Sequence, residues 1–265
     1  MIPLFSAEGL LRLRDMTRPG LLCAFDFDGT LAPIVADPTR AVLPDDIRER
    51  LVELSGCTAV AIITGRSLED IRPRLGFEPD FIVGNHGIEG LPDWERSASV
   101  YRNICDDWHA RLAAMLGGDP AAVGVEIEDK RYSLSVHYRR AADYGKAEEM
   151  LERLFEKLEP SPRVITGKCL FNLVPADAAD KGAAMIELLN ISGATSAIYV
   201  GDDVTDEDVF RMKRSDVLSI RVEPAADSAA DFFLPQHEDI AQLLDELVTQ
   251  LCRAGAQNWT RMDQE

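Results

Sequence analysis

The chain has 265 residues, 46% of them hydrophobic and 28% charged, which is typical of a globular protein with one large domain or a core with a smaller insert. Its formal net charge of −18 argues against nucleic acid or a membrane as a partner, so an anionic substrate must be held by local cations. The N-terminus shows no apolar leader, no apolar stretch has membrane length, and the five cysteines lie far apart. We therefore expect a cytoplasmic protein with reduced thiols.

The first ninety residues alternate between strand and helix patterns. Leu21–Phe27 is an apolar run that predicts a strand buried on both faces, as in the middle of a parallel sheet. A helix is expected over Asp45–Leu54, a second buried strand over Thr58–Ile63, a helix after Ser67 and a short strand over Phe81–Val83. This alternation is typical of an α/β fold.

The pattern changes after Gly90. Residues 132–138 alternate between polar and apolar side chains, which predicts a half-exposed antiparallel strand. The other elements expected here are a strand over Gly124–Ile127, short strands near Val164 and Leu170, and helices over Tyr101–Leu116 and Tyr144–Leu158. The stretch 93–175 is therefore predicted to be an inserted α+β domain.

The first pattern resumes at Asp180. A helix begins at Lys181, strands follow over Ala197–Val200 and Val217–Val222, and an amphipathic helix over His237–Leu251 closes the chain. We predict a doubly wound parallel-sheet core formed by residues 1–92 and 176–265.

Polar side chains gather where the predicted parallel strands end. Asp26 and Asp28 end the first strand on one side of it, Thr64 ends the second, and Asp202 follows a later strand, while Lys181 begins a helix. Because the carboxyl ends of neighbouring parallel strands converge, we expect one crevice that contains all of them. Oxygen ligands without histidine or cysteine favour Mg²⁺ over zinc.

These residue types together indicate phosphoryl transfer to a carboxylate nucleophile. At an effective dielectric constant near 20, each pair of like charges at about 4 Å costs roughly 4 kcal/mol, so a bare carboxylate cannot approach a phosphate. Lys181 and a metal ion would cancel that repulsion, and Thr64 would bind phosphate oxygens. Asp28 would protonate the leaving oxygen and then activate water.

Four motifs in this order, D-F-D-G-T-L, T-G-R, K-G and G-D-D, resemble those of the haloacid-dehalogenase (HAD) type phosphatases. The resemblance implies a HAD-like Rossmannoid core with the second class of α/β cap inserted after the second motif. It also implies that Asp26 is the nucleophile, Asp28 the acid/base, Thr64 the phosphate binder and Lys181 the stabilising cation. Mg²⁺ would be held by Asp26, by Asp202 and by the backbone carbonyl of Asp28.

Further matches are similar to the trehalose-6-phosphate phosphatases: D-G-T-L-A-P-I, G-N-H-G, E-D-K followed by an arginine, a later G-K, and G-D-D-V-T-D-E. This resemblance implies that substrate binding involves Arg66, His86, Glu128, Lys130, Arg139, Lys168 and Asn172. The family usually has a glutamate at the last of these positions. Asparagine still binds a sugar hydroxyl there, but without the charge.

Other interpretations of single residues stay open. His86 is either a packed turn residue or a substrate contact, and Glu128, Lys130 and Arg139 are either substrate contacts or a solvated strand face. Asp206 is expected to contact the metal ligands without binding the metal directly.

The sequence predicts a Mg²⁺-dependent phosphatase that hydrolyses trehalose 6-phosphate through an aspartyl-phosphate intermediate. The first alternative is a HAD phosphatase for a different sugar or glycosyl phosphate. A phosphomutase that returns the phosphoryl group to a sugar, and a non-catalytic sugar-phosphate sensor or synthase subunit, are further alternatives. Pairing with a trehalose-6-phosphate synthase is the protein partnership that the resemblance suggests.

Overall fold

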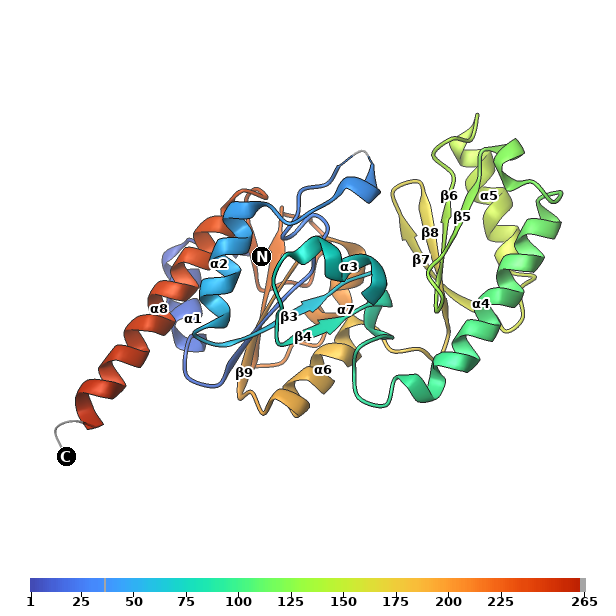
Figure 1. The fold of residues 1–265 in the computed structure, drawn as a ribbon. Coiled ribbons are helices and arrows are strands. Elements are labelled where there is room, and N and C mark those ends of the chain that lie inside the picture. Colours follow the sequence, from blue (N-terminus) through green and yellow to red (C-terminus); the bar gives the residue numbers. More distant parts are fainter. Residues whose placement is uncertain (36, 263–265) are drawn as a thin grey trace. The chain divides into compact units, whose positions relative to one another are not determined.

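The computed structural model describes residues 1–35 and 37–262, with side chains described as far as Leu251. It divides into two compact units (Figure 1). The core unit comprises Met1–Gly90 and Asp180–Glu265, and the insert unit comprises Leu91–Ala179; the predicted insert was 93–175. Among the described helices, none combines the length and the apolar character needed to cross a membrane.

The core unit contains the longer of the two sheets. Its elements are β1 (Ile2–Pro3), α1 (Ala7–Met16), β2 (Leu21–Phe25), α2 (Asp45–Ser55), β3 (Ala59–Ile63), α3 (Leu68–Leu75), β4 (Phe81–Val83), α6 (Lys181–Ser192), β9 (Ser196–Gly201), α7 (Glu207–Phe210), β10 (Val217–Val222), β11 (Phe232–Leu234) and α8 (Asp239–Met262). Single 3-10 turns follow β4 at Asn85–Gly87 and β9 at Val204–Asp206.

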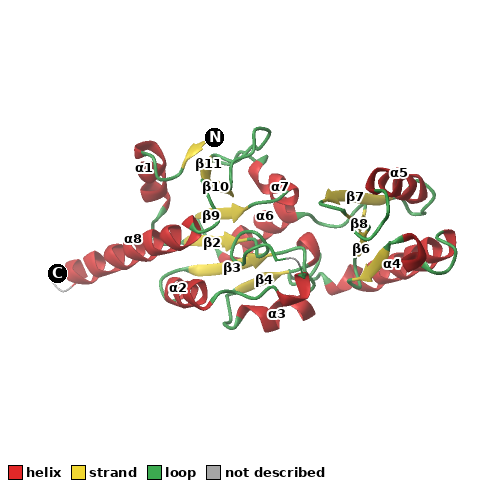
Figure 2. Cartoon of the chain, turned by 90° about the horizontal axis from the view of Figure 1, so that it is seen from above, coloured by secondary structure: helices red, strands yellow, loops and turns green. Residues whose placement is uncertain are grey.

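Within the described residues, the core sheet has seven strands in the order β1-β11-β10-β9-β2-β3-β4, and every pairing is parallel. Figure 2 shows these strands side by side. The strands β9, β2 and β3 are neighbours, so three of the four predicted motifs lie on adjacent strands. The predicted doubly wound α/β core is confirmed.

Helices cover both faces of this sheet because its strands are apolar on both sides. Leu21, Cys23 and Phe25 of β2 belong to the main hydrophobic cluster, which also contains residues of α1, α2 and α8. The intervening residues of β2 share the other face with Tyr199, which packs edge-on against Phe210 of α7 with ring centroids 6.0 Å apart. A strand with apolar residues at every position has to be buried in this way.

The insert unit is an α+β layer with a hydrophobic core of its own. Its elements are α4 (Glu95–Met115), β5 (Glu126–Asp129), β6 (Leu134–His137), α5 (Tyr144–Phe155), β7 (Pro162–Gly167) and β8 (Leu170–Pro175). The described strands pair antiparallel in the order β5-β6-β8-β7. One sheet face packs on α4 and α5, where the Trp108 indole donates a hydrogen bond to the backbone oxygen of Pro160 at 2.9 Å.

The prediction that residues 132–138 form an antiparallel strand is right, but the prediction of half exposure is wrong. Leu134, Ser135 and Val136 of β6 are buried on both faces. The strand lies between β5 and β8, and the Ser135 hydroxyl donates to Oδ1 of Asn172 at 2.6 Å. Side-chain hydrogen bonding therefore lets a polar residue occupy a covered position.

Some elements differ from the predictions. The strands β1 and β11 and the helix α1 were not predicted, and α4 begins at Glu95 instead of Tyr101. Gly9 interrupts the helical pattern of α1, and it is needed because a Cβ there would lie 2.1 Å from the backbone oxygen of Leu4.

The buried face of α6, the helix that begins at Lys181, allows a prediction about stability. Leu188 of α6 is fully buried, so Leu188→Ala should lower the free energy of unfolding by about 2–5 kcal/mol through lost burial and a residual cavity. The control Ile186→Ala, at a side chain that is 41% exposed on the same helix, should change it by about 0.5 kcal/mol or less. Urea unfolding monitored by circular dichroism measures both, and equal losses would contradict this packing.

Candidate active site

Adjacent ends of β9, β2 and β3 bring the predicted motif residues to one edge of the core sheet. Asp26 follows β2, Thr64 follows β3, and Asp202 follows β9. Asp26 and Thr64 are buried at 5% and 0% exposure, which is uncommon for polar side chains and requires that each has partners.

Lys181 is a buried cation held between two carboxylates. Its Nζ donates to Oδ1 of Asp26 at 2.8 Å and to Oδ1 of Asp206 at 2.7 Å. Asp180 caps the N-terminus of α6 and places Lys181 in the first turn. Burial lowers the pKa of the Lys181 ammonium, but the charges of Asp206 and Asp26 outweigh it, so the pKa is raised and the lysine stays charged.

Asp206 anchors this arrangement with both carboxylate oxygens. Its Oδ1 accepts from Lys181 and from the Tyr199 hydroxyl at 2.6 Å. Its Oδ2 accepts from the backbone N–H groups of Asp202 and Asp203, both at 2.9 Å. A Cβ on Gly201 would lie 2.2 Å from Cγ of Asp206, so this position has room for glycine alone. With its oxygens occupied in this way, Asp206 is better suited to hold Lys181 than to ligate a metal.

The acidic cluster at this edge fits a divalent cation. Carboxylate oxygens of Asp26, Asp202 and Asp206 lie within 4.8 Å of one another. Burial, followed by the neighbouring carboxylates, raises the pKa of Asp202 to about 7, and burial is also the largest cause of the raised pKa of Asp26. One lysine does not balance three carboxylates, and hard oxygen ligands are those that Mg²⁺ prefers. Asp26 and Asp202 are the two residues that would bind it.

Asp28 points to a different partner from that of Asp26. Its Oδ2 accepts from Nε of Arg66 and its Oδ1 from Nη2 of the same residue, both at 2.6 Å. Arg66, predicted as a substrate-binding residue, also donates to Asp70 at 2.6 Å. The predicted acid/base role of Asp28 and its contribution of a backbone carbonyl to the metal remain predictions.

The loop after β4 braces the Thr64 turn. The backbone N–H of His86 donates to the Thr64 carbonyl at 2.9 Å, and that of Asn85 donates to the Arg66 carbonyl at 2.8 Å. The His86 ring lies on Gly65, where a Cβ would be 2.4 Å from Cε1 of the ring. The ring is buried, so His86 packs the turn that presents Thr64, and its substrate contact remains a prediction.

In the insert unit, two predicted substrate-binding residues share a row across the sheet. Glu128 of β5 pairs with Ser135 of β6, which pairs with Asn172 of β8. Directly paired residues point to the same face, so Glu128 and Asn172 face the same side about 10 Å apart. Nε2 of His137 lies 3.0 Å from Oε2 of Glu128 and extends this polar face.

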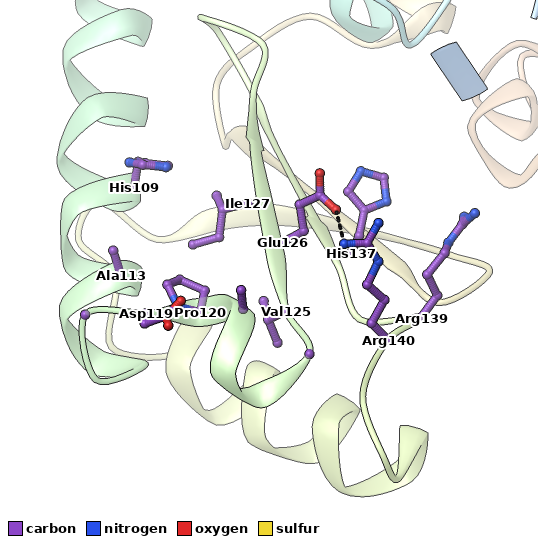
Figure 3. A pocket seen from close by; sticks show the side chains of 13 residues that line it. His109, Ala113, Asp119, Pro120, Val125, Glu126, Ile127, His137, Arg139 and Arg140 are labelled. Atoms are coloured by element: carbon purple, nitrogen blue, oxygen red, sulfur yellow. Dashed lines mark ion pairs between the residues drawn. The ribbon is translucent and has the colours of Figure 1, made fainter. Parts of the chain in front are cut away.

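The other predicted residues of the insert unit lie at the two ends of its sheet. Arg139 and Lys168 follow the ends of β6 and β7 at one end, and Lys130 lies in the β5–β6 turn at the other. Arg139 is one of the residues that line a hollow of about 470 Å³ beside β5, and Figure 3 shows their side chains. Glu126 and Arg140, which also line it, form an ion pair at 3.9 Å.

Sequence reasoning missed three supporting residues. The Thr30 hydroxyl donates to Oδ1 of Asp202 at 3.1 Å, Tyr199 binds Asp206, and Asp70 binds Arg66. The alternation along β9 offered a signal for Tyr199, since it places that side chain on the sheet face opposite the main hydrophobic cluster, where it packs against α7. The contact of Thr30 with Asp202 joins segments that lie far apart in the chain. The contact of Asp70 with Arg66, four residues away, depends on the side-chain rotamer of the arginine.

Adjacent acids that differ in environment provide a metal-binding test. Asp202→Asn should abolish the rise in melting temperature that Mg²⁺ gives the wild type, because one of two carboxylate ligands is lost. Without metal, this variant should be at least as stable as the wild type, since a buried repulsion is relieved. Asp203 is exposed and outside the cluster, so Asp203→Asn should retain the Mg²⁺ response. Thermal melts of each variant with and without Mg²⁺ measure this response. If Mg²⁺ raised the melting temperature of Asp202→Asn as much as that of the wild type, Asp202 would not be a metal ligand.

Residues 24–238 match the family model of the trehalose-phosphatases. The trehalose-phosphate phosphatase of Mycobacterium tuberculosis (strain H37Rv) is 33% identical over 87% of this chain and 62% of that protein. The chain thus spans less than two thirds of the length of this curated relative.

Solved structures share the fold. The C-terminal domain of trehalose-6-phosphate phosphatase from C. albicans superposes with a TM-score of 0.71 at 23% identity, covering 94% of this chain and 99% of that one. The sucrose-phosphatase from Synechocystis sp. PCC6803, solved with sucrose and phosphate, gives a TM-score of 0.55 at 19% identity, covering 88% and 98%. With most of its length matched by the family model, the chain belongs to the trehalose-phosphatase family.

Proposed function

We propose that this protein hydrolyses trehalose 6-phosphate to trehalose and phosphate through a phosphoryl group carried on Asp26. The observation that supports this most is the 2.8 Å contact between the Lys181 ammonium and Oδ1 of Asp26, beside Asp202. A buried carboxylate that contacts a fixed cation is prepared to meet a phosphate dianion without prohibitive repulsion.

The reaction would proceed in two steps. In the first, a carboxylate oxygen of Asp26 attacks phosphorus, the bond from phosphorus to the sugar oxygen breaks, and the Asp28 carboxyl gives its proton to that oxygen. In the second, the Asp28 carboxylate takes a proton from water, which attacks phosphorus and releases phosphate from Asp26. Each step leaves Asp28 in the protonation state that the other requires.

The surrounding residues would hold the charge of the phosphoryl group. Lys181 stays ionised beside Asp26, and the Thr64 hydroxyl and nearby backbone N–H groups would donate to phosphate oxygens. Mg²⁺ held by Asp26, Asp202 and the backbone carbonyl of Asp28 would supply further neutralisation of that charge.

We propose trehalose 6-phosphate as the substrate because of the family match and the polar residues of the insert unit. The family description and the name of the mycobacterial relative both specify trehalose phosphate. We infer that Glu128, Asn172 and the basic residues at both ends of the insert sheet bind sugar hydroxyls. A synthase partner and the cytoplasm as compartment remain predictions.

The nucleophile gives the direct test of this function. The wild type should release phosphate from trehalose 6-phosphate with Mg²⁺ and lose this activity on chelation. Asp26→Asn should reduce the rate by at least about 10³-fold, because an amide cannot accept the phosphoryl group. Asp216→Asn, a surface variant beside Arg214, is the control and should be fully active. Full activity of Asp26→Asn, measured as phosphate release, would refute the mechanism.

A phosphatase for another sugar phosphate is the second candidate, and the Ser135–Asn172 hydrogen bond favours it. The glutamate usual in the family is replaced here by an amide whose oxygen already accepts from Ser135. Rates of phosphate release from trehalose, sucrose, glucose and mannose phosphates separate the two candidates. Faster release from any of the last three would show that trehalose 6-phosphate is not the preferred substrate.

Asn172 should affect binding of the sugar but not transfer of phosphate. Asn172→Ala should raise KM for trehalose 6-phosphate roughly tenfold, as expected for a lost hydrogen bond worth about 1.4 kcal/mol, and leave p-nitrophenyl phosphate hydrolysis unchanged. The exposed Asn190 on α6 provides the control, Asn190→Ala. An unchanged KM would show that Asn172 serves only to hold Ser135.

A further inference from the structure

Arg66 is held by acceptors on both edges of its guanidinium. Its Nε and Nη2 donate to the two carboxylate oxygens of Asp28 at 2.6 Å each. Its Nη2 also donates to the Pro38 carbonyl at 3.0 Å, and Nη1 donates to Asp70 at 2.6 Å. Among the described residues, these contacts engage four of the five N–H groups, so the edge that would grip a phosphate is already occupied.

The guanidinium is also fixed from the side. Its Cζ lies 5.6 Å from the centroid of the buried Phe27 ring, and Arg66 is only 9% exposed. Asp70, which receives Nη1, is held in turn by Nη2 of Arg74 at 2.5 Å and by its Nε at 3.1 Å. A buried cation with this many partners keeps one orientation.

Asp28 has the opposite character. Its side chain is 37% exposed in the loop after β2, and it is absent from the carboxylate cluster formed by Asp26, Asp202 and Asp206. The bidentate pair with Arg66 therefore restricts a side chain that would otherwise change rotamer freely. A planar fork fixes a carboxylate through both oxygens, which the point charge of a lysine cannot do.

We propose that Arg66 is a positioning residue for Asp28 and does not itself bind the substrate. This inference rests on the proposed function, because it concerns the acid/base of that reaction. It replaces the sequence-based expectation that Arg66 is a substrate-binding residue. Loss of Arg66 should impair proton transfer from Asp28 to the sugar oxygen and from water to Asp28, while the attack of Asp26 on phosphorus is retained.

Leaving groups of different basicity separate these steps. A sugar oxygen needs a proton from Asp28 to depart, whereas p-nitrophenolate leaves as an anion. Arg66→Lys should therefore lower kcat for trehalose 6-phosphate by about 10²–10⁴-fold at nearly constant KM. With p-nitrophenyl phosphate, the variant should release a rapid burst of one p-nitrophenolate per active site and then turn over slowly, because Asp28 no longer activates water well.

Two further variants complete the experiment. Arg66→Ala should fold with a cavity that guanidinium ion enters, so millimolar guanidinium should restore the first turnover on trehalose 6-phosphate. Arg72→Lys, at an exposed residue of α3, is the matched control and should behave as wild type. Circular dichroism melts establish that each variant is folded.

Each outcome decides between roles of Arg66. A raised KM for both esters at constant kcat would show direct substrate binding and overturn the proposal, as would loss of the burst in a folded variant. Wild-type activity on p-nitrophenyl phosphate and other sugar phosphates, but not on trehalose 6-phosphate, would refute the proposed substrate alone. The Arg66 test would then use the accepted sugar phosphate. A wild type inactive on every ester would refute both.

Discussion

The ion triad of Asp26, Lys181 and Asp206 is the interaction on which the rest of the site depends. An ammonium group that is 1% exposed costs several kcal/mol to bury unless carboxylates surround it, and removal of Lys181 would leave two buried carboxylates without their cation. The triad ties together the end of β2, the start of α6 and the turn after β9. These three segments are distant in the sequence, and the triad fixes their relative positions more tightly than apolar packing alone would do.

Four acids near one sheet edge differ in environment because their hydrogen-bond partners differ. Asp206 is saturated by donors, and Asp202 accepts from Thr30 and is otherwise directed at the cluster. Asp26 receives the lysine, and Asp28 is turned to Arg66. All four residues are aspartates, so the different roles proposed for them rest on their hydrogen-bond partners.

The parts predicted well from the sequence are those determined by local patterns. Apolar runs such as β2 and β3 predict buried parallel strands, and the position of each motif after its strand predicts which acids lie at the same edge. β1 has two residues, too few for a pattern. The environments of Ser135, His86 and Arg66 depend on side chains contributed by other segments, so spacing could not reveal that Ser135 is covered, that His86 packs on Gly65 or that Arg66 binds Asp28.

The two units have separate hydrophobic cores, one around β2 and α8 and one around Trp108 and Phe171. A substitution that repacks the insert therefore changes a different set of buried side chains from those packed beneath the Asp26 edge. Under the proposed function, an exchange at a position such as 172 would change which sugar is bound, and the core residues proposed to transfer phosphate would keep their own packing.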